Sequence, residues 1–539
     1  MARISLVLGF LALFSQTTFG LLSQDLIHVV SGSPVSQETS SITLIDHITE
    51  VANQIDTLMA RVNTSSAQTA EQKASISCTI QNIVLPGSVI FMSSVEYSVT
   101  EDINWSETCW LPAACFVQPN NAVEVAVTLK VITAVKSKFA VRGGGHNANP
   151  GYSSIDDAGV LIDLQKMNGL AFEPNGITMQ AGPGNRWRAM YEFSEAHGRI
   201  VKGGRMETVG IPGYLLGSGM TYFPSLQGMA ADSIVNYEIV LADSSIINAN
   251  ANKNSDLFLS LKGGGSNFGI VTRFDIHTYP LIHAQYALYL YDIADYHNIF
   301  EATEEVQRRM EEDNKADTFV SVSSEGMVIG MFYADTPAEP PSIFKPFLSL
   351  DSQVSTLIPL TNGTVLSLAI SLAAAFPTYN AKRIPTTINT LPNSTLYVSQ
   401  HERFMRMVQE NTFNASLSYT IEPVTSAMIR EGKARGGNSC GMSEISQSSW
   451  SFVVEWEGEG GDTAALQTSN SFRDALETTA QADDLLLRYR FMNHASFAQT
   501  VLDTYGPENL DRLRSTAATY DPRGAFQELQ NDGFLLRKV

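Results

Sequence analysis

Alternating apolar and polar residues predict a mixed first region of strands and helices. After the strand-like CFVQP segment that begins at Cys115, the apolar residues from 123 to 132 follow helical spacing. Strand patterns then cover 138–141, 159–164, 176–181, 236–242, 245–249 and 270–277, with a helix over 187–197. This order predicts a βαβ start that leads into a larger set of strands.

The pattern changes after Pro280. Alternation over 287–291 and 450–456 predicts strands, and the charged segment 301–315 predicts a helix that turns Val306 and Met310 inward. The apolar run 366–376 suits a buried helix or strand. We expect this region to be an antiparallel sheet with helices on one side. Before the first region, the amphipathic segment 44–62 predicts a surface helix.

Composition and the N-terminus point to an exported globular protein. The chain has 539 residues, which favours two domains. Its formal net charge of −20 argues against a nucleic-acid partner. Residues 1–20 have Arg3, an apolar run and small polar residues, as in a secretory signal peptide too short to span a membrane. Glycosylation sequons occur at Asn63, Asn104, Asn362, Asn393 and Asn414.

A glycine cluster carries the first candidate chemistry. In AVRGGGHNANPGYS, residues 140–153, Gly143, Gly144 and Gly145 precede His146. Glycines without a Cβ let the backbone lie against a flat or phosphorylated ligand. A neutral imidazole beside them can act as a base, a metal ligand or a covalent nucleophile. Such a turn taken alone is more often a loop with a solvated histidine.

Further glycine-rich segments support a functional role for this cluster. They are AGPGNRW at 181–187, VKGGRMETVGIPGYLLGSG at 201–219, LKGGGSNFGIVT at 261–272, and YDPRGAF at 520–526. Together they resemble the covalent flavoprotein family that includes berberine bridge enzyme, in the vanillyl-alcohol oxidase or PCMH-type superfamily, and especially its secreted fungal branch. A Rossmann fingerprint is rejected because Trp187 replaces its third glycine. The chain contains no Walker A motif, Gly-x-Ser-x-Gly elbow or metal-ligand spacing.

The resemblance implies an α+β fold, with a two-subdomain FAD-binding domain and a substrate domain whose antiparallel sheet is covered by helices. It divides the chain into a signal peptide (1–20), an N-terminal segment (21–108), a PCMH-type FAD-binding domain (109–282), a substrate domain (283–487) and a C-terminal segment that returns to the FAD domain (488–539). Backbone amides at 143–145, 210–213 and 263–265 would face the FAD pyrophosphate and ring.

The resemblance also implies FAD joined covalently to the ring of His146. Many members add a bond from a cysteine three residues before a Val-Gly pair, but this chain has Met206 there, so we expect a single linkage. A disulfide between Cys78 and Cys115 is implied, whereas the state of Cys109 and Cys440 stays open. The other implied cofactor contacts are Arg142, Gly143, Gly144, Gly145, Val209, Gly210, Gly213, Tyr214, Gly264, Asn267, Gly269 and Asn493.

The catalytic base is the part that the sequence leaves least determined. The family's active-site tyrosine after the flavin-linked histidine is replaced by Ala148, and its catalytic acid or amide falls at Ser451, which is not a base. Glu455 shares a strand face with Ser451. The candidates for binding or proton transfer are Tyr152, His494 and Glu455.

These features predict a secreted, monomeric oxidase that moves hydride from a secondary-metabolite small molecule to flavin N5 and then to O2, giving H2O2, with oxidative cyclisation as one outcome. Val209 stands where the family controls oxygen access to the flavin. One alternative is an extracellular carbohydrate oxidase, which Met206 disfavours because such enzymes usually carry two flavin bonds. The other is a flavin-binding cyclase without net redox. Neither a nucleic acid nor a membrane is expected as a partner.

Overall fold

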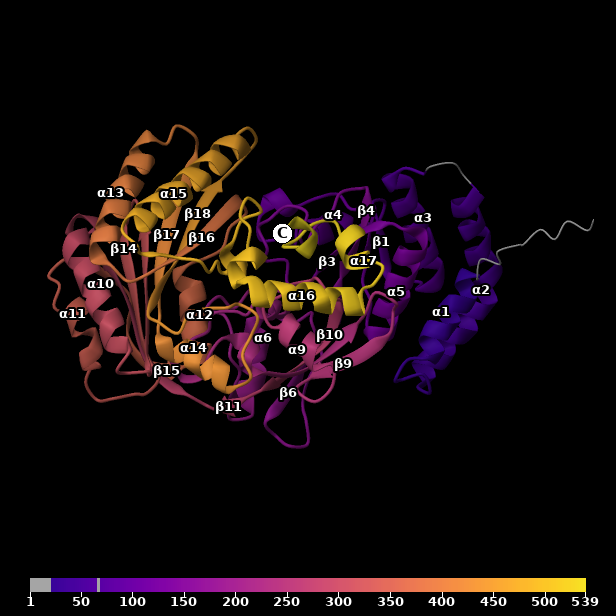
Figure 1. Cartoon of the computed structure of the whole chain (residues 1–539), viewed down its shortest axis with the longest axis horizontal. Helices are drawn as coiled ribbons and strands as arrows, with labels where there is room; N and C mark the ends of the chain where they lie inside the picture. The colour runs from indigo at the N-terminus through magenta and orange to yellow at the C-terminus, as the bar shows by residue number, and fades with distance from the viewer. Residues whose placement is uncertain (1–20, 65–67) are drawn as a thin grey trace, which may run out of the picture.

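Three sheets and a short ribbon organise the computed structural model, which describes residues 21–64 and 68–539. In the described part of the chain, the sheets have four, five and eight strands. Figure 1 shows the eight-stranded sheet with its helices at one end of the molecule and the N-terminal helices at the other. The predicted signal peptide lies outside the described residues.

The four-stranded sheet contains the predicted βαβ start. Its order is β1 (Val89–Phe91), β2 (Cys115–Val117), β4 (Gly159–Asp163) and β3 (Lys138–Arg142). Strands β2 and β3 both run parallel to β4, and the connection between them is α5 (Ala122–Val135). This helix begins where the Asn121 side chain accepts a hydrogen bond from the Glu124 backbone N–H, an N-cap.

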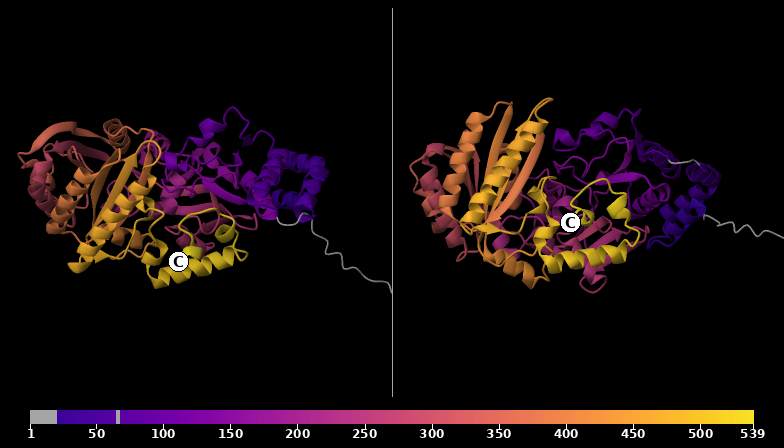
Figure 2. Two further views of the ribbon diagram at one scale, coloured as in Figure 1. Left: turned by 90° about the horizontal axis from the view of Figure 1, so that it is seen from above. Right: turned by 45° about the horizontal axis from the view of Figure 1, so that its top comes forward.

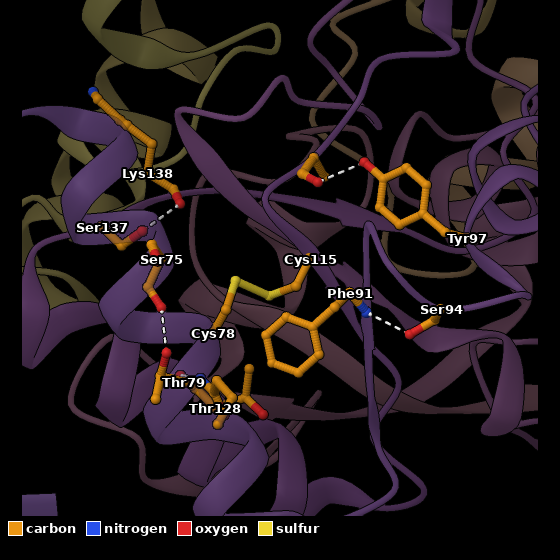
Figure 3. The surroundings of a disulfide bond; sticks show 12 residues. Ser75, Cys78, Thr79, Phe91, Ser94, Tyr97, Cys115, Thr128, Ser137 and Lys138 are labelled. Carbon is orange, nitrogen blue, oxygen red and sulfur yellow. Dashed lines mark hydrogen bonds between the residues drawn. A yellow bond between two sulfur atoms is a disulfide. The ribbon is translucent and has the colours of Figure 1, made fainter.

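The N-terminal helices pack on α5 and are tied to the sheet by a disulfide. They are α1 (Leu22–Ser31), α2 (Thr39–Thr64) and α3 (Ala70–Val84). Cys78 of α3 is bonded to Cys115 of β2, the pairing that the family resemblance implies (Figure 3). Cys109 and Cys440 are buried free thiols, and burial raises the pKa of Cys109 to about 12 and that of Cys440 to about 11.

The five-stranded sheet is antiparallel throughout. Its order is β5 (Leu170–Phe172), β6 (Thr178–Ala181), β10 (Ile270–His277), β8 (Ile234–Val240) and β9 (Ile246–Asn250). The helices of this region are α6 (Trp187–Ala196), α7 (Ile211–Leu216), α8 (Pro224–Gln227) and α9 (Ser255–Leu261). A ribbon of β7 (Arg199–Ile200) and β11 (Tyr279–Pro280) leads into the last sheet.

The eight-stranded sheet is antiparallel, as predicted. Its order is β15 (Gln353–Thr364), β12 (His283–Tyr291), β14 (Gly326–Tyr333), β13 (Ala316–Ser323), β17 (Ala415–Val424), β18 (Gln447–Trp456), β16 (Lys382–Thr390) and β19 (Leu486–Leu487). One face is covered by α10 (Tyr296–Met310), α13 (Ser394–Glu410) and α15 (Asp462–Ala482) (Figure 1). Phe452 of β18 stacks on Phe472 of α15 with ring centroids 4.2 Å apart. The opposite face is thereby left for the first region.

Two predicted segments of this region are adjusted by the structure. The charged helix α10 starts and ends five residues before the predicted 301–315, because the chain must turn after Met310 to enter β13 at Ala316. The apolar run 366–376 is a helix, α12 (Val365–Ala375), which begins where the Thr364 hydroxyl accepts the Ser367 N–H. Helix α11 (Lys345–Leu348) precedes β15, and α14 (Ser426–Ala434) follows β17.

The C-terminal segment returns to the first region. It contains α16 (Pro507–Tyr520) and α17 (Ala525–Glu528), and both views of Figure 2 show this yellow segment against the purple and magenta strands. Phe526 is buried with its ring 5.8 Å from that of Phe139, and Gln530 forms a bridge with the same strand residue. Among the described residues, no helix has the length and apolar character to cross a membrane.

One predicted glycosylation site is wrong in the folded chain. Asn104 is only 3% exposed, its amide nitrogen donates to Ser153, and its oxygen accepts from Arg142. A glycan on that nitrogen would have no path to solvent. Asn362 and Asn414 are exposed and Asn393 is half-buried, whereas the side chain of Asn63 lies outside the described residues.

Candidate active site

Two glycine turns meet at backbone contact distance. A Cβ on Gly144, just after β3, would lie 2.4 Å from the Cα of Gly210, which precedes α7. A Cβ on Gly143 would lie 2.3 Å from Cγ of Pro212. Among the described residues, none accepts a hydrogen bond from the backbone N–H groups of Gly144, Gly145 and His146. This glycine cradle therefore lets the two turns pack against each other, and it leaves free amide donors that suit a phosphorylated ligand.

His146 follows the glycine cradle in the chain, and its imidazole is neutral. Its half-buried ring stacks on Trp105, with centroids 4.5 Å apart and planes 12° from parallel. Burial lowers the pKa of His146 to about 3, with further lowering by the cations Arg186 and Arg383. A ring nitrogen lone pair is therefore available at neutral pH.

Three predicted residues lie on or against helix α7, which begins just after Gly210. The Asn493 amide donates to the Gly213 carbonyl at 3.0 Å and accepts from the Gly219 N–H at 3.3 Å, so it joins the helix to the segment that follows it. The ring of Tyr214 packs edge-on against Trp187 at 5.2 Å. Val209 is half-buried in the loop before α7, and its N–H donates to the Met206 carbonyl.

An ionic cluster that the sequence did not predict links this loop to the eight-stranded sheet. The Arg205 guanidinium donates to both oxygens of Asp317 on β13 at 3.1 Å and to Glu422 on β17 at 2.6 Å. The Asp317 carboxylate is fully buried. One cation between two carboxylates leaves a net negative cluster, which favours cationic or hydrogen-bond-donating groups nearby.

His494 lies beside this cluster, at the end of the 3₁₀ turn Met492–His494. Its Nδ1 is buried and is without a hydrogen-bond partner in the described part of the chain. Burial lowers the pKa of His494, and the charge of Glu422 opposes that shift. The neutral imidazole of His494 and the carboxylate of Glu422 therefore lie near each other, and both can accept a proton. We call these two groups the proton-accepting wall.

Two catalytic candidates from the sequence do not join this wall. Both oxygens of Glu455 are engaged, because Oε1 accepts from the Arg383 guanidinium at 2.5 Å and Oε2 accepts from the Tyr379 hydroxyl at 3.1 Å, so the prediction of a free base there is wrong. Arg205 engages only Oε1 of Glu422. Tyr152 packs edge-on against Phe534 at 5.2 Å, and the Lys538 ammonium lies 5.4 Å from its ring. Its neighbours therefore belong to the C-terminal tail.

Several predicted cofactor contacts instead hold the protein together. The amides of 263–265 donate to the carbonyls of Leu261, Ser260 and Leu216, so they are not free to bind a pyrophosphate. The Asn267 amide bonds Gly264 and the tail residues Phe534 and Leu536. A Cβ on Gly264 or Gly269 would collide with a backbone oxygen, at 2.3 and 2.6 Å respectively. These residues are packing and anchoring positions.

Arg142 is likewise committed inside the protein. Its guanidinium pairs with Asp163 at 3.0 Å and donates to Asn104, and both charged side chains are at most 1% exposed. We expect Asp163→Ala to lower the free energy of unfolding by about 3–5 kcal/mol, because it leaves a buried cation unpaired. Chemical denaturation measures this loss. Asp335→Ala, which removes an exposed partner of Lys315, is the matched control and should change stability little.

Comparison with known proteins identifies the family. The model of the FAD binding domain matches residues 113–250. An FAD-dependent monooxygenase of Arthrobotrys oligospora is 35% identical over 81% of this chain and 85% of its own length. One of Penicillium terrestre is 30% identical over 86% and 89%. The chain belongs to the berberine bridge enzyme-like family of FAD-linked oxidoreductases.

Solved structures show how widely this oxidoreductase fold is shared. Xylooligosaccharide oxidase from Myceliophthora thermophila matches with a TM-score of 0.71 at 18% identity, over 86% of this chain and 99% of its own. Glucooligosaccharide oxidase from Acremonium strictum, described with a 6-S-cysteinyl, 8α-N1-histidyl FAD, matches at 0.69 and 16%, over 83% and 97%. At these identities the likeness concerns the fold. The chain is thus an FAD-dependent oxidoreductase with the architecture that its glycine motifs predict.

Proposed function

We propose that this oxidoreductase carries FAD on His146 through a single covalent bond and oxidises a hydroxyl-bearing small molecule with O2 as the electron acceptor. The observation that carries the proposal is the cradle of Gly144 and Gly210 beside a neutral His146, close to the wall of Glu422 and His494. The FAD binding domain match and the fungal FAD-dependent relatives support the same cofactor.

The residues present fit the cofactor. Free amides at Gly144, Gly145 and His146 suit its phosphates or ring oxygens, and the missing Cβ atoms of Gly144 and Gly210 let the two turns beside these amides close on each other. When bound, FAD accepts a hydride from the substrate and passes the two electrons to O2, which gives H2O2. Met206 cannot supply a second linkage, because a thioether has no thiolate.

The covalent attachment of FAD to His146 must conserve atoms and electrons. The bond replaces the ring N–H of His146 and one C–H of the flavin 8α-methyl by a C–N bond, so two protons and two electrons leave. O2 accepts them as H2O2. The pKa of His146, lowered mainly by burial, keeps the nucleophilic ring neutral throughout the physiological range.

Substrate deprotonation falls to the wall beyond the cradle. Glu422 can accept a hydroxyl proton, and Arg205 holds its carboxylate by a charge-assisted hydrogen bond of 2.6 Å. The unpartnered Nδ1 of His494 can accept or relay the proton. A net negative cluster also favours neutral alcohols, phenols or amines over acids as substrates.

Oxygen use is tested at Val209. Val209→Leu adds one methylene beside the proposed flavin site, and we expect it to slow the reoxidation of reduced enzyme by O2 several-fold, because it narrows the approach. Stopped-flow absorbance of the flavin measures the rate. Val235→Leu, at an exposed position of β8, is the matched control. Equal reoxidation rates in wild type and Val209→Leu would remove the reason to call the enzyme an oxidase on this ground.

Oxygen insertion is the main competing outcome, since the relatives are named monooxygenases. Turnover under ¹⁸O2 separates the two: an oxidase leaves the label in H2O2, and a monooxygenase places one labelled atom in the product. Cyclisation without net redox would consume no O2 at all. A relative in Alternaria solani, 30% identical over 86% of this chain, is named bifunctional solanapyrone synthase and not monooxygenase, so a reaction without oxygen insertion stays within the proposal.

A carbohydrate oxidase is the second candidate. The sheet register places the half-buried hydroxyl side chains of Thr420 and Ser451 opposite each other on β17 and β18. Such a pair suits a substrate with several hydroxyl groups. Higher kcat/KM for oligosaccharides than for aromatic alcohols would select this candidate.

We also infer export, which the disulfide and the sequence of residues 1–20 support.

A further inference from the structure

A chain of stacked and charged groups runs from the eight-stranded sheet to His146. Trp105 stacks on the imidazole with centroids 4.5 Å apart, and the guanidinium carbon of Arg383 lies 4.4 Å from the centre of the Trp105 ring. Arg383 belongs to β16 and is 1% exposed. The stack therefore connects three parts of the sequence that are separated by 41 and 278 residues.

Backbone hydrogen bonds hold Trp105 between the cradle and the sheet. Its N–H donates to the Gly145 carbonyl at 2.9 Å, and its own carbonyl accepts from the Arg383 guanidinium. The Arg383 N–H donates to the Ser106 hydroxyl at 2.8 Å, and the Glu107 N–H donates to the Ala381 carbonyl at 2.9 Å. Hydrogen bonds on both sides of Trp105 therefore fix the backbone segment that carries the indole.

Glu455 completes the arrangement from the neighbouring strand. It lies directly across from Arg383 in the β16–β18 register and binds the guanidinium at 2.5 Å. Arg383 also donates to the Tyr379 carbonyl at 2.7 Å. These bonds restrict the guanidinium to one position over Trp105, where the cation attracts the aromatic face.

We propose that Trp105, held by Arg383 and Glu455, is a positioning residue that fixes the ring of His146 for attachment to FAD. The inference rests on the proposed covalent linkage. An imidazole on a glycine turn has few side chains to restrain it, and bond formation needs the ring nitrogen aligned with the flavin methyl carbon. Stacking on an immobile indole supplies that restraint.

The stack also influences the charge state of His146. Burial is the main cause of its low pKa, and the cations Arg186 and Arg383 and the neighbouring His494 lower it further. Removing the Arg383 charge therefore raises the pKa of His146 toward its ordinary value. A protonated ring cannot attack, so attachment in that variant should fail at a higher pH than in wild type.

The test follows attachment directly. Full-length protein produced under riboflavin limitation is mixed with FAD at several pH values, and flavin fluorescence in the acid-precipitated pellet is followed over time. We expect Trp105→Leu to slow attachment by roughly 10-fold to 100-fold. Trp105→Phe, which keeps a stacking ring, should stay close to wild type. Trp110→Leu is the matched control, since Trp110 lies in the same segment and its indole N–H donates to the Asn104 carbonyl, away from the His146 stack.

Arg383→Gln provides the second readout, because it keeps the Trp105 side chain but removes the guanidinium that holds it, so attachment should also slow. We expect the acid limb of the attachment rate to move to higher pH in Arg383→Gln and to stay in place in Arg383→Lys. If Trp105→Leu attaches FAD as fast as Trp110→Leu, or if Arg383→Gln attaches FAD at the wild-type rate, the positioning role is overturned. If wild type itself attaches no FAD, the covalent linkage fails instead, which distinguishes the two proposals.

Discussion

Replacing His146 with alanine should leave no flavin in the acid-precipitated protein, whereas wild type should retain about one per chain. The cradle of Gly144 and Gly210 stays intact in this variant, so FAD can still bind without a covalent bond and should appear in the supernatant. Absorbance of pellet and supernatant measures the partition.

Asn147→Ala is the control for His146→Ala, because this exposed side chain accepts from the Asn149 N–H and not from the His146 ring or the glycines. If His146→Ala kept acid-stable flavin, the attachment would lie on another residue. A wild-type pellet without flavin would show that the cofactor is held without a bond. Oxygen consumption by His146→Ala with the same substrate then reports how far the linkage contributes to hydride transfer.

Glu422→Gln should lower kcat/KM by about 10²-fold to 10⁴-fold, the usual contribution of a positioned general base. Glutamine keeps the size of the side chain and an oxygen that can accept from Arg205, so folding should be little affected. Steady-state oxygen consumption measures the loss. Glu444→Gln, at an exposed partner of Lys433, is the control.

The pH dependence gives Glu422→Gln a second readout. Burial lowers the pKa of His494 and the negative charge of Glu422 raises it, so removing that charge lowers it further. If neutral His494 is required, the acid limb of kcat/KM should lie below the ordinary histidine range near 6.5 and move to lower pH in the variant. An unchanged rate in Glu422→Gln would exclude the carboxylate as the base.

The cradle could be predicted from sequence because its chemistry is local. The consecutive glycines before His146, and Gly210 after Val209, mark the positions without side chains. The structure brings these two turns into contact. The strand patterns were equally informative, since the alternation over 450–456 became β18 with Phe452 and Trp456 facing the helices.

The proton-accepting wall could not be predicted in the same way. Arg205, Asp317 and Glu422 meet across 112 and 217 residues, and only the strand order β13–β17 places the two carboxylates side by side. Alternation in β17 would have put Ser418, Thr420 and Glu422 on one face, which was the available signal. For Glu455, the strand face alone does not predict the role of the side chain, because Arg383, the partner that neutralises it, lies on a neighbouring strand.

The bond between Cys78 and Cys115 has a practical consequence for making the protein. It clamps the N-terminal helices to the strand that leads, through α5 and β3, to the glycine turn of His146. In the cytoplasm of a standard bacterial host the two thiols would stay reduced, and the helical layer would rely on its packing alone. Yeast or filamentous fungal secretion is therefore the production route in which this clamp can close before the cofactor is added.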